Sequence, residues 1–335
     1  MGSEFISFFS FPILLLDLYM KNVYGLLLVL LCASCVRQVG NNVTDVVCVE
    51  NVLYRGWYDC IKLSNSKVSI IVNPTYGGQI LYFGLNETNE NVLWADSVVN
   101  GWTINEYAEK HRSPDSGRFD IGPERITEHI HDSIWAGFYQ SFVEVDAVRL
   151  QSPDSQTMGI KVEKIYKLDR QNPTLHVIQK MTNISRHEVE YCFWTRTLLP
   201  SGGIYFCDAH TDTNHLTAYS EMSLLDDSLH PSLPSEDRVH CANNIFTAYP
   251  GGEKEYRYGI NFTTGTFCYL RNHLLYVKQN VYVPNGTYDC NNGINFTNMI
   301  YFCNQFIEME PLSPMVKLQP GESYQYEEVW SLYNW

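Results

Sequence analysis

The segment FIEMEPLSPMVKLQPGESYQYEEVWSLY, residues 306–333, decides the fold and lies close to the end of the 335-residue chain. Its start alternates like a β-strand, which places Glu308 and Glu310 on one face and two apolar side chains on the other. A Pro-Gly pair then predicts a turn, and the alternate positions from Tyr324 to Leu332 predict a second strand. Two carboxylates on so hydrophobic a strand either face water or line a pocket in which one of them transfers protons.

The rest of the chain shows the same organisation of strands and turns. Residues 67–85 read as two strands separated by a turn that contains Pro74 and Gly78. Helical periodicity is weak, and only residues 104–111 predict a turn or two of helix. Further strands are predicted at residues 159–168, 174–183, 188–199, 266–283, 298–311 and 322–333. We therefore expect an all-β fold, a large antiparallel sandwich.

Two long stretches, residues 95–125 and 208–245, interrupt this pattern. Both are rich in Ser, Pro, Asp and His, and both predict loops that are too long to be hairpin connections. Loops of such length in a compact β fold are usually functional or disordered. Because no repeat or clean linker appears, the sequence predicts one domain that extends from about residue 40 to the C-terminus.

Composition restricts the possible partners. The chain has 23 Lys and Arg against 37 Asp and Glu, a net charge of −14, and its cations form no cluster. Nucleic acid and anionic membrane surfaces are therefore not expected as partners, because binding to phosphates requires concentrated positive charge. Aromatic residues make up 14% of the chain, which favours a β-rich globular protein over a disordered one.

Residues 1–35 are predicted to be a signal or leader segment. From Met20 onward a basic residue, an apolar run at 24–31 and small residues follow in the order of a secretory signal, and residues 1–19 are interpreted as a possible upstream extension. Polar residues interrupt the apolar sequence too often for a membrane span. We expect a secreted or extracytoplasmic protein without a membrane span in its mature form. The sequence CASC also resembles a lipoprotein box, so a lipid anchor at Cys35 on the cell surface is the alternative.

Cysteines and glycosylation sequons support export. The even number of cysteines after the leader, without CxxC metal spacing, favours disulfides over a zinc site, and buried free thiols remain the alternative. The pairs Cys48–Cys60 and Cys290–Cys303 are plausible on proximity alone. The eight cysteines are Cys48, Cys60, Cys192, Cys207, Cys241, Cys268, Cys290 and Cys303. Six Asn-x-Ser/Thr sequons predict a glycoprotein: they begin at Asn42, Asn86, Asn183, Asn261, Asn285 and Asn295.

Three separated segments resemble the galactose mutarotase (aldose 1-epimerase) superfamily. VNPTYGGQILYFGLNETNENVLW (72–94) is similar to its opening hairpin, MTNISRHEVEYCFWTRTLLPSGG (181–203) to its central strand pair, and residues 306–333 to its C-terminal ending. GRFDIGPE (117–124) resembles an uncharacterised exported branch of the superfamily. The resemblance implies that residues 36–335 form one β-supersandwich of the galactose mutarotase-like type, with a sugar-binding cleft on a concave sheet face and no cofactor.

The resemblance also implies catalytic residues. The catalytic base of the family falls on Glu308 in this chain. His129 and His131, in TEHIHDSIW, lie roughly where the family has a second histidine and are the candidate acids. At the position of the central histidine of the family this chain has Thr195 and Arg196 instead. Anomer interconversion needs a carboxylate and an imidazole a sugar's width apart, with pKa values near the working pH.

Six further residues are candidates for sugar binding. An arginine can bind two hydroxyl groups at once, an aromatic ring can stack on the apolar face of a sugar, and the alternatives are ion pairs and core packing. His210 opens a long loop that could reach the cleft, and Glu310 lies about 6.5–7 Å along the strand from Glu308, a separation that would also suit a glycosidase pair. The candidates are Arg118, Arg196, Trp194, Trp135, His210 and Glu310. His129 and His131 could instead bind a metal, but no third ligand is evident, so no metal site is expected.

The sequence therefore predicts an exported carbohydrate-active protein that acts on or binds a mono- or oligosaccharide. As an enzyme it would be an isomerase of the aldose 1-epimerase type, with acid–base catalysis by Glu308 and a histidine. The alternative is a non-catalytic carbohydrate-binding or cell-surface interaction protein with the same fold. The sequence does not identify the sugar, the oligomeric state or the disulfide pairing.

Overall fold

Two antiparallel β-sheets make up the domain. The structure is a computed structural model, and it describes residues 46–110, 115–123, 132–211, 217–225, 228–232, 237–290 and 293–335. Within these residues every strand pair is antiparallel, and the helices are the short η1 (Ser97–Val99), α2 (Ile104–Glu109) and α3 (Asp132–Trp135). The predicted all-β class and the antiparallel sandwich are confirmed.

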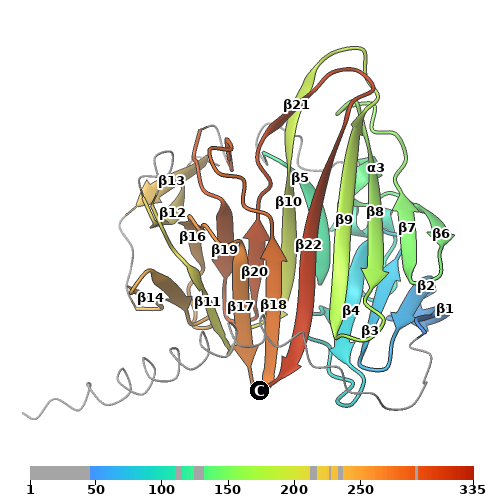
Figure 1. The fold of residues 1–335 in the computed structure, drawn as a ribbon, viewed down its shortest axis with the longest axis horizontal. Helices are drawn as coiled ribbons and strands as arrows, with labels where there is room; N and C mark the ends of the chain where they lie inside the picture. Colours follow the sequence, from blue (N-terminus) through green and yellow to red (C-terminus); the bar gives the residue numbers. More distant parts are fainter. Residues whose placement is uncertain are drawn as a thin grey trace, which may run out of the picture. The chain divides into compact units, whose positions relative to one another are not determined.

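The larger sheet has 12 strands in the described residues. In spatial order its main path is β1 (Cys48–Tyr54), β2 (Trp57–Ser64), β3 (Val68–Asn73), β4 (Gln79–Leu85), β5 (Gly117–Gly122), β10 (Val189–Pro200), β20 (Phe306–Pro311), β19 (Asn298–Phe302), β16 (Tyr256–Ile260), β12 (Tyr219–Leu225) and β13 (Ser228–Ser232), and β21 (Val316–Leu318) pairs with β10 outside this path. Strands that are distant in sequence, β5, β10 and β20, are therefore neighbours in the middle of this sheet (Figure 1).

The smaller sheet has 10 strands in the described residues. In spatial order they are β14 (Val239–Ala242), β15 (Ile245–Ala248), β11 (Ile204–Asp208), β17 (Thr266–Arg271), β18 (Leu274–Asn280), β22 (Ser323–Asn334), β9 (Thr174–Asn183), β8 (Ile160–Leu168), β7 (Ala147–Gln151) and β6 (Gln140–Val143).

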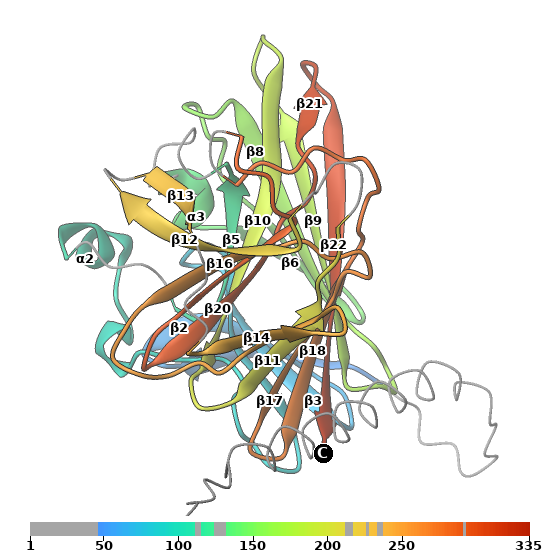
Figure 2. The same ribbon diagram turned by 90° about the vertical axis from the view of Figure 1, so that its left-hand side faces the viewer.

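The main core lies between the two sheets. Ile307 and Met309 of β20 and Trp330 and Leu332 of β22 belong to one buried hydrophobic cluster, as their alternation in the sequence predicts. Figure 2 shows the sheets as two layers, with α2 on the side of the larger sheet away from β18 and β22. We call this side of the larger sheet its outer face. Because Ile307 and Met309 point into the core, Glu308 and Glu310 point to the outer face.

Some predicted elements differ from those observed. The stretch at 266–283 divides into β17 and β18 at Asn272, whose φ of 55° is left-handed and suits a tight hairpin turn. The stretch at 298–311 likewise divides into β19 and β20. The predicted long loops contain β5, β12, β13 and β14, which form because neighbouring strands pair with them. Such pairing is non-local and leaves little signal in short, polar segments.

Lys164 is buried in the core, and no ion pair between described residues joins it to a carboxylate. Its ammonium donates a hydrogen bond of 2.7 Å to the carbonyl of Gly77 and lies 4.7 Å from the ring centre of Tyr139. Burial lowers the pKa of Lys164 to about 7, although the negative charge of Asp120 opposes this shift. The protonated form of Lys164 is therefore disfavoured in the folded state.

This lowered pKa predicts a pH dependence of stability. The unfolded chain keeps the Lys164 proton up to a pH of about 10, whereas the folded chain releases it near pH 7. Between these values the unfolded state binds more protons, so Lys164 makes the free energy of unfolding rise with pH, by at most about 1.4 kcal/mol per pH unit. We expect the Lys164→Met variant to lack this contribution. The measurement is urea unfolding of variant and wild type between about pH 7 and 8.5.

The difference between the two proteins isolates Lys164 from the other groups that titrate in this range. Lys161→Met is the matched control, because Lys161 lies on the same strand and its side chain is 32% exposed, 3.5 Å from Asp154. The control is expected to have the wild-type pH slope. Equal slopes in all three proteins would show that Lys164 does not change its protonation on folding.

Two predicted covalent features are not confirmed. The eight cysteines from Cys48 onward are free thiols, and in the β1–β2 register Cys60 faces Val52, four residues from Cys48, which is about 13 Å and too far for a disulfide. Among the sequons, Asn183 and Asn261 are buried and their amides donate to backbone carbonyls, so they cannot carry a glycan in this fold. Asn285 is exposed, and its glycosylation stays a prediction; Asn42 lies outside the described residues.

Candidate functional site

Charged side chains gather on the outer face where β5, β10 and β20 are neighbours. The registers pair Arg118 with Arg196, and Thr197 with Met309, which places Glu310 beside Arg196. Five of these residues are referred to below as the charged cluster: Arg118, Asp120, Arg196, Glu308 and Glu310. Residues that alternate with them, such as Phe119, point into the core, so the strand alternation alone directs all five to the outer face.

Arg196 is the centre of the charged cluster. Its Nε atom lies 3.2 Å from Oδ2 of Asp120 and 3.3 Å from Oε2 of Glu310, and its Nη1 atom lies 3.9 Å from Oε2 of Glu308. The guanidinium also lies 5.0 Å from the ring centre of Trp194. Three carboxylates and an aromatic ring thus fix this arginine in one orientation.

Glu310 and Trp194 support each other. The indole Nε1 of Trp194 donates a hydrogen bond of 2.8 Å to Oε2 of Glu310, and Trp194 is only 2% exposed. Trp194 packs with Met222 and Tyr288 in a second hydrophobic cluster. Glu310 is therefore held by two neighbours, and Trp194 orients it. Direct contact of either residue with a sugar stays a prediction.

Glu308 is the least committed carboxylate of the cluster. Its side chain is 12% exposed, and it accepts no hydrogen bond from the described residues. Its closest charged contact among them is Arg196, whose Nη1 atom lies 3.9 Å from Oε2 of Glu308. Its oxygens can accept a proton or a hydrogen bond from a hydroxyl group. Glu308 therefore has the position and the freedom that a general base or a hydroxyl acceptor needs.

An aromatic strip that the sequence analysis missed flanks Glu308. The rings of Trp94 and Phe306 lie 4.5 Å apart between centres, and the ring of Tyr301 lies 5.8 Å from that of Phe306. Tyr301 is the cross-strand partner of Glu308, and all three rings are half-buried. A half-buried aromatic surface beside a carboxylate suits the apolar face of a sugar. In the sequence Trp94 stands out only as the end of NVLW, and Tyr301 lies beside Glu308 only through the register of β19 with β20.

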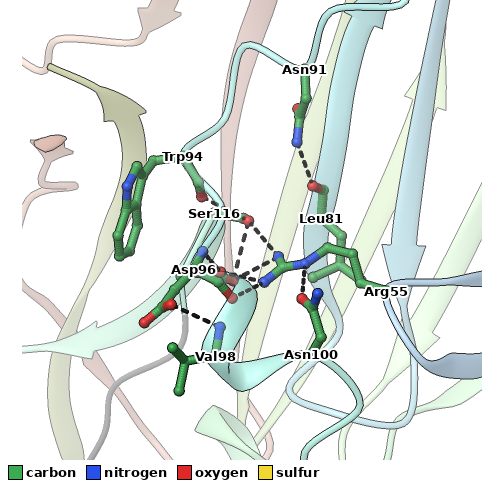
Figure 3. A network of polar contacts seen from close by, with 9 residues as sticks. Arg55, Leu81, Asn91, Trp94, Asp96, Val98, Asn100 and Ser116 are labelled. Atoms are coloured by element: carbon green, nitrogen blue, oxygen red, sulfur yellow. Dashed lines mark hydrogen bonds and ion pairs between the residues drawn. The ribbon is translucent and has the colours of Figure 1, made fainter. Parts of the chain in front are cut away.

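A buried network fixes the chain beside Trp94 (Figure 3). The guanidinium of Arg55 lies 2.6 Å from Oδ2 of Asp115, donates 2.6 Å to Oδ1 of Asn100, and donates 2.7 Å to the carbonyl of Asp96. Asp115 also accepts the backbone N–H of Asp96 at 2.6 Å. In Figure 3 the ring of Trp94 points away from this network. The network therefore anchors the backbone from which Trp94 reaches Phe306.

This network predicts the effect of a single substitution. Asp115→Asn removes the charge that Arg55 needs but keeps one acceptor, so we expect the free energy of unfolding to fall by about 2–3 kcal/mol. Glu50→Gln is the matched control, because its pair with Lys62 at 3.0 Å is exposed and is expected to contribute less than about 1 kcal/mol. Urea unfolding measures both. Equal, small effects would show that the Arg55 network does not stabilise the domain.

The other predicted site residues lie elsewhere or outside the described part of the chain. His129 and His131 lie outside the described residues. Trp135 ends α3 and packs, half-buried, against a cluster that contains Tyr107. His210 is 38% exposed, with Nε2 3.7 Å from Oδ2 of Asp208 at the end of a strand of the smaller sheet. The structure thus brings together Glu308, Glu310, Arg118, Arg196 and Trp194, and it does not join His210 to them.

The described residues contain no group of three or more His, Cys, Asp or Glu side chains that could hold a metal ion. Within the same residues, no helix has the length and apolarity that crossing a membrane requires. A pocket of about 350 Å³ lies between the ends of β3, β4 and β22 and is lined by Lys67, Glu87 and Tyr333 among others, but by no residue of the charged cluster.

Comparison with known proteins identifies the fold. No protein-family model and no curated protein matches the chain. Among solved structures, a putative aldose 1-epimerase from Escherichia coli K12 matches with a TM-score of 0.56 and 13% identity, over 86% of this chain and 100% of that chain. A galactose mutarotase-like protein from Clostridium acetobutylicum matches with a TM-score of 0.54 and 10% identity, over 87% and 100%.

A third similar structure is a TPR-domain containing protein from Parabacteroides distasonis ATCC 8503, with a TM-score of 0.57 and 13% identity. The match covers 82% of this chain, and the chain spans 46% of that longer protein. The chain therefore has the galactose mutarotase-like fold, which confirms the predicted β-supersandwich. The TM-scores of 0.54–0.57 establish the fold, and at identities of 10–13% they establish nothing beyond it.

Proposed function

We propose that this protein binds a mono- or oligosaccharide on the outer face of the larger sheet and that Glu308 is its proton acceptor. The observation that carries the proposal is the uncommitted carboxylate of Glu308, which lies 3.9 Å from Arg196 and beside the half-buried ring of Tyr301. A carboxylate, a fixed guanidinium and an aromatic surface are the groups that recognise a sugar through hydroxyl hydrogen bonds and ring stacking.

The charges in the cluster favour an uncharged sugar. Asp120, Glu308 and Glu310 outnumber Arg118 and Arg196, so the cluster carries a net negative charge when all five groups are ionised. Both arginines already face carboxylates, so a phosphate or uronate would meet three acids and no uncompensated cation. A ligand that donates hydroxyl hydrogen bonds to the carboxylates is the better match.

The chemistry that we propose is anomer interconversion. Glu308 takes the proton from the anomeric hydroxyl while an acid protonates the ring oxygen, so the bond between the anomeric carbon and the ring oxygen breaks and the open aldehyde forms. Rotation of the aldehyde followed by reversal of both proton transfers gives either anomer. Arg196, 3.9 Å from Glu308, keeps this carboxylate in position. The candidate acids are His129 and His131, and this role stays a prediction.

Non-catalytic sugar binding is the second candidate, and a specific observation favours it. Where the resembling family has a central histidine, this chain has Thr195 and Arg196. Thr195 points into the core and hydrogen-bonds Glu328, while Arg196 is held among the three carboxylates of the charged cluster. Neither can act as the acid near neutral pH. In a non-catalytic protein of this kind, Glu308 would accept a hydrogen bond from a sugar hydroxyl and would take up no proton.

Export is part of the proposal. The apolar segment at 24–31 and the small residues after it suggest cleavage before a secreted domain, with a lipid anchor at Cys35 as the alternative. Mass spectrometry of the mature N-terminus in the natural host would separate the two. An N-terminus that retains residues 1–35 without a lipid would contradict both.

A panel of common aldoses and oligosaccharides tests the function. We expect at least one uncharged sugar to raise the melting temperature of the wild-type protein, and NMR exchange spectroscopy to show faster anomer interconversion than in buffer. Sugar binding without an increase in rate would favour the non-catalytic alternative. If no sugar on the panel binds or exchanges faster, the proposal is wrong.

A further inference from the structure

Gln79, the first residue of β4, is a buried glutamine whose amide has no partner in the described structure. It is 2% exposed, and neither its Nε2 nor its Oε1 atom makes a hydrogen bond. An orphaned buried polar atom destabilises the folded state, and such atoms in native proteins usually meet a water or a ligand. Gln79 therefore carries one donor group and one acceptor that the folded chain leaves unused.

The strand registers place Gln79 in the same row as the charged cluster. Ile80 pairs with Gly117 and lies in the core, so Gln79 lies beside Arg118 on the outer face. Arg118 pairs in turn with Arg196. Gln79 therefore lies two strand spacings, about 10 Å, from Arg196. It lies three strand spacings, about 14 Å, from Glu310. A Gln and a Glu side chain can bridge the longer distance with one sugar ring between them, above the two arginines.

Other orphaned polar atoms lie at the same end of the row. Nδ2 of Asn73, the cross-strand partner of Gln79, has no hydrogen-bond partner in the described residues. The hydroxyl groups of Tyr76 and Tyr107, whose rings stack 4.3 Å apart between centres, have none either. Tyr76 lies close enough to Arg118 for the charge of the guanidinium to act on its hydroxyl. Besides Gln79, three side chains in this neighbourhood thus carry a polar atom without a partner, although Oδ1 of Asn73 accepts two hydrogen bonds from Thr75.

We propose that Gln79 is a specificity-determining residue, and that its amide binds two neighbouring hydroxyl groups of the sugar held at the charged cluster. This inference rests on the proposed function. The amide N–H donates to one hydroxyl oxygen and the amide carbonyl accepts from the next, so an equatorial or axial change at either carbon breaks one of the two bonds. A site built in this way discriminates strongly against a sugar that lacks one hydroxyl, because its own polar atom is then buried without a partner.

The competing explanation is that Gln79 only holds a buried water. The Gln79→Met variant separates the two, because methionine has a similar size and no amide. In both cases the melting temperature stays unchanged or rises, since an orphaned polar group is replaced by an apolar one. Only a ligand-binding role predicts that the dissociation constant for the bound sugar rises as well, by about 10- to 100-fold.

Gln179→Met is the matched control. Gln179 of β9 is equally buried, and its Nε2 atom also has no partner in the described residues, but it lies in the smaller sheet. The control is expected to bind the sugar like the wild type. If Gln79→Met does not fold, Gln79→Glu keeps the size and the acceptor, removes the amide donors, and is expected to show a similar loss of affinity.

Deoxy analogues of the sugar complete the experiment. We expect removal of one particular hydroxyl to weaken binding to the wild type about 10-fold or more, and to have much less effect on Gln79→Met, because the partner is already absent. Equal sugar affinity of Gln79→Met and wild type would overturn the inference and leave the proposed function standing. A wild-type protein that binds no sugar would overturn both.

Discussion

Replacement of Glu308 by glutamine is expected to lower the protein-catalysed rate of anomer interconversion by about 10²- to 10⁴-fold, the contribution of a general acid or base. The amide preserves the size of the side chain and its ability to accept a hydroxyl hydrogen bond, but it cannot take up a proton. Because the closest charged contact of Glu308 is Arg196 at 3.9 Å, we expect little change in stability. NMR exchange spectroscopy at saturating sugar measures the rate, and calorimetry measures the affinity.

Two further glutamate variants make this experiment specific. Glu310→Gln disturbs a carboxylate that Trp194 and Arg196 both contact, so it is expected to lower stability as well as activity. Glu327→Gln, on the smaller sheet and 40% exposed, is expected to behave like the wild type. Full activity in Glu308→Gln would refute its role as the base. A loss of sugar binding with no wild-type rate enhancement would identify Glu308 as a ligand contact of a binding protein.

The strand pattern of the sequence predicted the fold and the direction of Glu308. In β20 and β22 the period of two alone separates core from surface, because one face of each strand packs against a sheet. β5 was missed because its six residues, GRFDIG, lie among residues typical of loops, and the strand exists only through its pairing with β10. Local patterns therefore predicted the long strands and failed for the short ones.

The composition of the site was less predictable than the fold. Arg118 and Arg196 could be singled out as rare cations, and the register does bring them together. Gln79 and Tyr301 carry no unusual local signal, and each joins the site only because an adjacent strand places it beside a charged residue. Trp194 is only 2% exposed and packs in its own hydrophobic cluster, and its contact with a sugar stays a prediction. Which residues are neighbours on adjacent strands depends on the pairing register, and a single sequence does not determine that register.

A buried ion pair in the core contacts β10, the strand that carries Arg196, on the side that faces the smaller sheet. Nζ of Lys278 lies 3.2 Å from Oε2 of Glu328, and both side chains are fully buried. The same ammonium donates hydrogen bonds to Thr195 at 3.2 Å and Thr197 at 2.9 Å, the two residues on either side of Arg196 in β10. Burial lowers the pKa of Lys278, and the negative charge of Glu328 opposes the shift. The pair thus links the smaller sheet to the strand at the centre of the charged cluster.

Removal of one partner of this pair is expected to have the largest effect on stability of any single change considered for this protein. Lys278→Met leaves the Glu328 carboxylate buried without its cation, so we expect the free energy of unfolding to fall by about 3–5 kcal/mol, measured by urea unfolding. The double variant Lys278→Met with Glu328→Leu removes both charges and should recover most of this loss, because apolar replacement of a whole buried pair is often neutral or stabilising. A double variant as unstable as the single one would show that the hydrogen bonds of Lys278 and Glu328 to Thr195 and Thr197, rather than the charges, hold the sheets together. If the double variant is stable yet binds sugar more weakly than the wild type, the pair also positions Arg196 through β10.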